Sequence, residues 1–140
     1  MKKSISLIGM AGAGKSCIGA KLAKYSNFNF VDSDKLIETI ENKTLQEILD
    51  EKGIEKFKKI EETILLSVKF NQTILATGGS VIFSKKAMNH IKSNSSVIYL
   101  EVSYEDIMYR ISDFSNRGFI KEADQTMKHA FNERESIYRE

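Results

Sequence analysis

The sequence predicts an α/β protein, a three-layer doubly wound sandwich with a mainly parallel central sheet. Two observations favour this fold. Short runs rich in apolar and β-branched residues alternate with longer segments of helical period, and a glycine-rich segment joins the first run to the first helix. Strands separated by helices pair in parallel, because each helical connection returns the chain to the end of the sheet where the previous strand began. Such sheets bind ligands at the carboxyl ends of their strands, so we expect functional residues directly after each strand.

The individual elements follow from local patterns. Thr44 and Glu47 have the spacing of a capping box, which predicts a helix start, and Gly53 predicts the end of that helix. Between residues 111 and 123 the helical pattern is lost, which predicts a mobile surface loop of about a dozen residues, a length that is usually functional or disordered in a compact domain. The strands are expected at residues 5–8, 28–31, 73–76 and 97–100, and the helices at about 15–25, 35–41, 44–53, 54–68, 103–110 and 124–138.

Length and composition exclude several classes of protein. With 140 residues and 41% hydrophobic content, the chain is expected to form one domain, residues 1–140. Its 21 basic and 19 acidic residues leave a net charge of +2, too little for a chain whose main task is to grip nucleic acid. No segment approaches the roughly 20 apolar residues of a membrane helix, and a lone cysteine, Cys17, is typical of a reducing compartment. We therefore expect a cytoplasmic monomer with no nucleic-acid or membrane partner.

The strongest motif is the segment from Gly9 to Ser16, GMAGAGKS, which matches the phosphate-binding pattern G-x-x-x-x-G-K-[ST] between a strand and a helix. Its glycines let backbone amides point at phosphate oxygens, Lys15 can reach the β and γ phosphates, and the Ser16 hydroxyl can ligate Mg²⁺. The thiol of Cys17 is expected to be buried and inert. The segment predicts a nucleoside triphosphate site whose backbone or side-chain contacts come from Gly12, Ala13, Gly14, Lys15, Ser16 and Cys17.

Two carboxylates follow the second strand, beside the phosphate-binding segment. Mg²⁺ favours a nearby carboxylate together with several retained waters, a role that suits Asp32. Asp34 could accept a hydrogen bond from a substrate hydroxyl and orient or deprotonate it. The alternative for Asp34 is a structural one, because a residue just before the helix at 35–41 can be its N-cap.

Together with motifs further along, these residues resemble the shikimate kinases. Members of that family are small P-loop enzymes, related in fold to nucleoside monophosphate kinases, that transfer the γ-phosphate of ATP to the 3-hydroxyl of shikimate. The resemblance extends over nearly the whole chain. The segments that carry it are Gly53-Ile54-Glu55-Lys56-Phe57-Lys58-Lys59-Ile60-Glu61, Ala76-Thr77-Gly78-Gly79-Ser80, the pair Arg110 and Arg117, and Arg134 with Tyr138, which resembles a closing Arg-x-x-x-Tyr element.

The resemblance implies an acceptor-binding region at about 33–62. Lys58 and Arg134 would bind the carboxylate of shikimate, and Asp34 would accept its hydroxyl. Main chain at Gly78 and Gly79 would approach the ligand closely, because glycine has no Cβ to obstruct it. One turn along the helix, at i+3, Glu61 could hold Lys58, although spacing alone favours a solvated helix face.

The resemblance also implies a lid at about 111–123. From it, Arg117 would swing in to neutralise charge on the transferred phosphoryl group while closure excludes water. Arg110 would lie over the adenine ring. The alternative for both is an ordinary surface arginine.

Three features depart from the family pattern. Lys58 stands where the family has arginine, Ser80 replaces the third glycine of the turn, and Gly118-Phe119 follows Arg117 in place of Pro-Leu. If the chain ends at Glu140, the family's last strand and its adenine-contacting loop are missing, and we expect nucleotide affinity to suffer. These departures keep two other interpretations open: a related kinase for another small hydroxylated metabolite, and a catalytically weak ATP-binding module.

Overall fold

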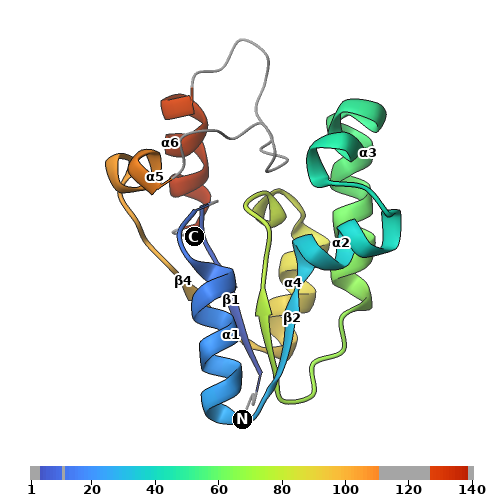
Figure 1. The fold of residues 1–140 in the computed structure, drawn as a ribbon, viewed down its shortest axis with the longest axis vertical. Coiled ribbons are helices and arrows are strands. Elements are labelled where there is room, and N and C mark those ends of the chain that lie inside the picture. The colour runs from blue at the N-terminus through green and yellow to red at the C-terminus, as the bar shows by residue number, and fades with distance from the viewer. Residues whose placement is uncertain (1–3, 11, 111–126, 139–140) are drawn as a thin grey trace.

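The central sheet has four strands, all parallel, in the order β2-β3-β1-β4 (Figure 1). The computed structural model describes residues 4–10, 12–110 and 127–138. The strands are β1 (Ile5–Ile8), β2 (Asn29–Asp32), β3 (Thr73–Ala76) and β4 (Ser96–Tyr99). All four lie within one residue of the predicted positions, and the parallel pairing is confirmed.

Helices cover both faces of this sheet, which confirms the three-layer arrangement. The chain contains α1 (Lys15–Ser26), α2 (Ser33–Glu41), α3 (Leu45–Ser67), the 3₁₀ turn η1 (Val81–Phe83), α4 (Lys85–Asn94), α5 (Tyr104–Arg110) and α6 (Met127–Tyr138). On one face α1 packs directly on the strands, since a Cβ at Gly19 would lie 2.8 Å from the ring of Phe30. None of the described helices is long and apolar enough to cross a membrane.

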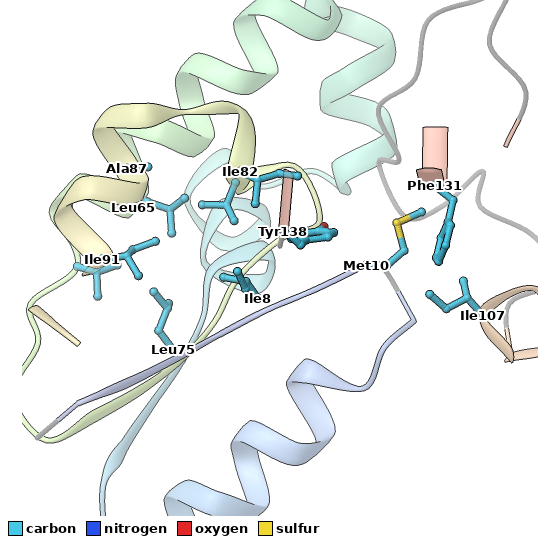
Figure 2. Close-up of a cluster of buried hydrophobic side chains, with 12 residues drawn as sticks. Ile8, Met10, Leu65, Leu75, Ile82, Ala87, Ile91, Ile107, Phe131 and Tyr138 are labelled. Carbon is cyan, nitrogen blue, oxygen red and sulfur yellow. The ribbon is translucent and has the colours of Figure 1, made fainter. Parts of the chain in front are cut away.

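The main hydrophobic core lies on the other face. There β1 and β3 contribute Ile8 and Leu75, which pack with Leu65 of α3 and Ile91 of α4. Figure 2 shows the same cluster continuing past Tyr138 to Met10, Ile107 and Phe131. Through these contacts α5 and α6 are attached at the carboxyl end of the sheet, beside the segment that follows β1.

A second, smaller core lies within the helical region after β2. It is formed by residues of α2 and α3 alone: Ile37, Leu45, Ile48, Phe57 and Ile64. α3 runs through the predicted break, but Gly53 has φ 84° and ψ 170°, so two helices meet there at a kink. A left-handed φ suits glycine, which is why the chain turns at this position.

The sequence analysis missed one helix. Lys85 and Lys86, both exposed, begin α4 (Lys85–Asn94), for which no helix was expected. The apolar signal of this helix is only Ala87 and Ile91, one turn apart and fully buried, while Ser84 caps it by accepting from the amide of Ala87. So sparse an apolar stripe is hard to recognise within a polar segment. The expected lid at 111–123 lies outside the described residues.

Candidate active site

The phosphate-binding segment has the backbone geometry that its glycines predict. Gly12 and Gly14 have φ 87° and 96°, in the left-handed region. Gly14 is the N-cap of α1, and no side chain caps the amides of the first turn. Ala13 is buried in the turn, and its amide donates to the carbonyl of Met10 at 3.0 Å. The positive end of α1 therefore lies behind a loop of main-chain amides, as anion sites require.

Lys15 is buried within this loop. Its ammonium donates to the carbonyls of Gly9 at 2.6 Å and Met10 at 2.8 Å. The cation is thus held at the mouth of the loop by groups of the loop itself. Cys17, in the first turn of α1, has an exposed thiol, so the expectation of a buried thiol is wrong.

Ser16 and Asp32 lie side by side. The Ser16 hydroxyl donates to one oxygen of Asp32 at 2.6 Å. The other Asp32 oxygen accepts from the amides of Asp34 and Lys35, which makes Asp32 the N-cap of α2. The capping role considered for Asp34 therefore belongs to Asp32. A hydroxyl next to a carboxylate is a pair of hard oxygen donors, which fits Mg²⁺ bound by few protein ligands and several waters.

Asp34 and Glu61 face each other across the turn after β3. A Cβ at Gly78 would lie 2.5 Å from an Asp34 carboxylate oxygen and 2.7 Å from a Glu61 oxygen, so a larger residue there would force these carboxyl groups to move. The amide of Gly78 donates to the hydroxyl of Ser33, a buried residue at the start of α2. Sequence reasoning did not single out Ser33, since serine at the start of a helix is common.

Glu61 is deeply buried, and its carboxyl group accepts a hydrogen bond from Ser80 at 2.8 Å. Burial, with the nearby negative charge of Asp34 as a smaller cause, raises the pKa of Glu61 to about 8. The expectation that Glu61 holds Lys58 is not met, because no ion pair joins them in the described part of the chain. The Ser80 hydroxyl, at the turn after β3, donates its hydrogen bond to Glu61 instead.

Lys58 and Arg134 meet at an aromatic ring. The Lys58 ammonium lies 4.8 Å from the centroid of Phe83, and the guanidinium carbon of Arg134 lies 5.2 Å from it. Only 2% of Arg134 is exposed, and burial lowers the pKa of its guanidinium. A pocket of about 230 Å³ opens beside this ring, lined by Glu55, Lys58, Lys59, Glu61, Glu62, Ser80, Phe83 and Ser84. The sequence analysis did not identify Phe83 as a site residue, because it ends the apolar run Val-Ile-Phe, which is typical of a hydrophobic core.

Tyr138 connects the two halves of the site. Its hydroxyl lies 2.9 Å from the carbonyl of Gly9 and 2.6 Å from that of Gly79, so one buried proton is shared between the phosphate-binding segment and the turn after β3. The ring stacks on Tyr99 at 5.1 Å between centroids. Burial raises the pKa of the Tyr138 hydroxyl well above its usual range, so it stays a donor. The Arg-x-x-x-Tyr spacing was the only sequence signal for this residue.

The structure thus brings together most of the predicted site residues at the carboxyl end of the sheet. Arg110 ends α5, but its side chain is outside the described part, and Arg117 lies outside the described residues. Figure 1 shows α3 and α6 on opposite sides of the segment that carries η1. Lys58 of α3 and Arg134 of α6 both reach the ring of Phe83. A phosphate-binding loop near a small pocket lined by Lys58 and Lys59, on a parallel α/β sheet, defines a P-loop kinase for a small molecule.

Comparison with known proteins identifies the kind of kinase. A family model described as shikimate kinase matches residues 11–140. A shikimate kinase of Sulfurihydrogenibium sp. is 35% identical over 138 residues, covering 98% of this chain and 83% of the relative. A shikimate kinase of Pasteurella multocida is 39% identical over 124 residues, covering 88% of this chain and 71% of the relative. The chain belongs to the shikimate kinase family and is a phosphotransferase.

A solved structure agrees with this assignment. Shikimate kinase from Acinetobacter baumannii in complex with shikimate matches 99% of this chain and 79% of its own, with a TM-score of 0.87 and 29% identity. The match covers the helical region between β2 and β3 as well as the sheet.

Proposed function

We propose that this chain transfers the γ-phosphate of ATP to the 3-hydroxyl of shikimate, with Mg²⁺ as cofactor, as one catalytic domain. The observation that carries the proposal is the meeting of the phosphate-binding segment with two buried or half-buried cations, Lys58 and Arg134, at one edge of the sheet. Membership of the family supports it. We further propose a cytoplasmic monomer, in keeping with the single free cysteine.

On the nucleotide side, Lys15 exchanges its carbonyl contacts for the β and γ phosphates, while amides from Gly12 to Cys17 bind phosphate oxygens. Ser16 and Asp32 hold Mg²⁺, which when bound neutralises phosphate charge. Arg110 lies over adenine, and Arg117 completes the site from a lid at 111–123. These residues together position and stabilise the transferred group.

On the acceptor side, Asp34 accepts the hydrogen of the attacking hydroxyl and orients it toward the phosphate-binding segment. Lys58 and Arg134 bind the acceptor's carboxylate. Gly78, Gly79 and Ser80 form the wall against which the ring of the acceptor rests, with the Ser80 side chain turned away toward Glu61. These groups come from α2, α3, α6 and the turn after β3, so the folded chain is needed to assemble them.

The test is ADP release with ATP and Mg²⁺, measured with shikimate and with related hydroxy acids. We expect turnover that depends on shikimate, and a loss of several orders of magnitude in Lys15→Met, because a preorganised positive charge is removed at similar side-chain length. Full activity in Lys15→Met would contradict the phosphate-site assignment.

Two observations favour a second candidate, a kinase for another small hydroxy acid. Lys58 presents a point charge in place of a planar fork, and Ser80 adds a side chain to the turn. Turnover that is faster with a different hydroxy acid than with shikimate would establish this alternative. ATP binding with no turnover on any acceptor would favour a binding module.

A further inference from the structure

Phe83 occupies an unusual place in the site. It ends η1, directly after the turn that carries Gly78 and Ser80, and its ring is half-buried in the wall of the 230 Å³ pocket. The Lys58 ammonium reaches it from α3 and the Arg134 guanidinium from α6. Both cations lie within the roughly 6 Å at which the negative face of an aromatic ring attracts them.

A ring and a carboxylate would hold these cations with different consequences. A carboxylate would cancel a positive charge and compete with an anionic ligand, whereas a ring attracts a cation and leaves its charge intact. Among the described residues no ion pair to Lys58 is found, and its ammonium lies 4.8 Å from the centroid of the Phe83 ring. The neighbouring Glu61 accepts from Ser80 instead.

The charge balance of the pocket points the same way. Burial raises the pKa of Glu61 to about 8, so near neutral pH this carboxyl group is mostly protonated and does not cancel the cations. With Glu61 neutral, Lys58 and Lys59 face Glu55 and Glu62 in the lining of the pocket, and Arg134 adds a positive charge at the ring of Phe83. The positive charge that Lys58 and Arg134 bring to this ring suits a ligand with one carboxylate.

We propose that Phe83 is a positioning residue: it holds Lys58 and Arg134 where they bind the acceptor's carboxylate, and thereby sets the preference for a carboxylate-bearing acceptor. The inference rests on the proposed function and deepens it. Phe83 touches neither phosphate nor the attacking hydroxyl, so its effect is on acceptor binding and not on phosphoryl transfer itself.

The first experiment compares Phe83→Leu with the unmodified chain in steady-state kinetics. We expect the KM for shikimate to rise about three- to ten-fold, with kcat and the KM for ATP changed less than two-fold. The methyl ester of shikimate lacks the negative charge, so its KM is expected to be unchanged. Phe83→Tyr, which keeps the ring face, is expected to restore the KM for shikimate.

Phe70→Leu is the matched control. Phe70 is also half-buried and contacts a basic ring, His90, at 5.6 Å, but it lies outside the pocket. It should leave the KM for shikimate unchanged. An equal rise in KM in Phe70→Leu and Phe83→Leu would overturn the proposal, because the effect would then be general loss of packing.

A variant that keeps the shape of the Phe83 side chain separates the loss of cation–π attraction from misfolding. Replacement of Phe83 by 3,4,5-trifluorophenylalanine keeps the size of the ring and weakens its negative face. We expect the KM for shikimate to rise here too, and the effect of Phe83→Leu to shrink in a Lys58→Ala background. A KM insensitive to fluorination, or full additivity with Lys58→Ala, would overturn the proposal. Failure of the proposed function is distinguishable, since the unmodified chain would then show no shikimate-dependent turnover.

Discussion

At the scale of single residues, the site depends on an unusual meeting of two acids. Asp34 and Glu61 approach the same glycine so closely that a Cβ at Gly78 would lie less than 3 Å from both. Two carboxylates in such a place cannot both be charged without a large electrostatic cost. Glu61 is the more buried of the two, and burial together with the negative charge of Asp34 raises its pKa to about 8, so near neutral pH the shared proton belongs on Glu61.

The protonation of Glu61 predicts how stability depends on pH. In the unfolded chain Glu61 titrates near 4.5, whereas in the folded chain its pKa is about 8. Between these values the folded state holds a proton that the unfolded state has lost, so the free energy of unfolding falls as pH rises through this window. Glu61→Gln carries no charge at any pH. Urea unfolding should therefore show Glu61→Gln gaining stability relative to the unmodified chain as pH increases from 4.5 to about 8.

Glu55→Gln is the control, because Glu55 is exposed on the same helix. The free energy of unfolding of Glu55→Gln, relative to the unmodified chain, should not follow this pH profile. If Glu61→Gln also differed from the unmodified chain by a constant amount at every pH, Glu61 would be ionised in the folded state.

Local motifs made some of these residues predictable and others not. Lys15, Asp32 and Asp34 lie where a strand passes through a short connection into the next helix, so residues close in sequence determine their surroundings. Phe83 acts through residues 25 and 51 positions away, so its partners depend on how α3 and α6 pack. No short window of sequence contains that information.

At the scale of elements, α6 carries two site residues on one buried face. Ala130, Phe131, Arg134 and Tyr138 recur with helical spacing and are all buried. The end of this face presents Arg134 to η1 and the Tyr138 hydroxyl to the carbonyls of two loops. The helix therefore joins the nucleotide side to the acceptor side.

Tyr138→Phe tests this attachment. The ring and its stacking on Tyr99 are kept, but the carbonyls of Gly9 and Gly79 lose a buried donor. We expect the free energy of unfolding to fall by about 1–3 kcal/mol in urea titrations, the usual effect of removing one partner of a buried hydrogen bond. Tyr109→Phe, at a position 92% exposed, should change it by less than about 0.5 kcal/mol. Equal values for the two variants would show that the hydroxyl bridge is energetically neutral.

Elements differed in how well the sequence predicted them. The strands were predictable because apolar, β-branched runs of four residues between polar turns have few other uses. The kink in α3 was signalled by Gly53. By contrast, α4 shows only two fully buried positions, Ala87 and Ile91, so its helical character comes from packing against α3 and β4 that no local pattern displays.

At the scale of the whole molecule, the chain has two hydrophobic cores of unequal size. The larger lies under the sheet and includes residues of β1, β3, α3, α4 and α6, while the smaller joins only α2 and α3. α3 belongs to both, with Leu65 in the first core and Phe57 in the second. The smaller core supports the region proposed to bind the acceptor, 33–62, which therefore depends on fewer apolar contacts than the sheet.

This division predicts that the acceptor-binding region opens by itself. Local unfolding requires less free energy where fewer apolar contacts are broken, and Gly53 interrupts α3 within this region. In native-state hydrogen exchange, amides of α2 and of residues 45–62 should exchange faster than those of β1 and β3. Shikimate bound between Lys58 and Asp34 joins α3 to α2, so saturating shikimate should slow exchange there and leave β1 and β3 nearly unchanged. Lys58→Ala removes one of the two side chains that shikimate would connect, so at the same shikimate concentration it should lose most of this protection. Uniform exchange across both cores, or equal protection by shikimate in Lys58→Ala, would mean that the fold opens only as one unit.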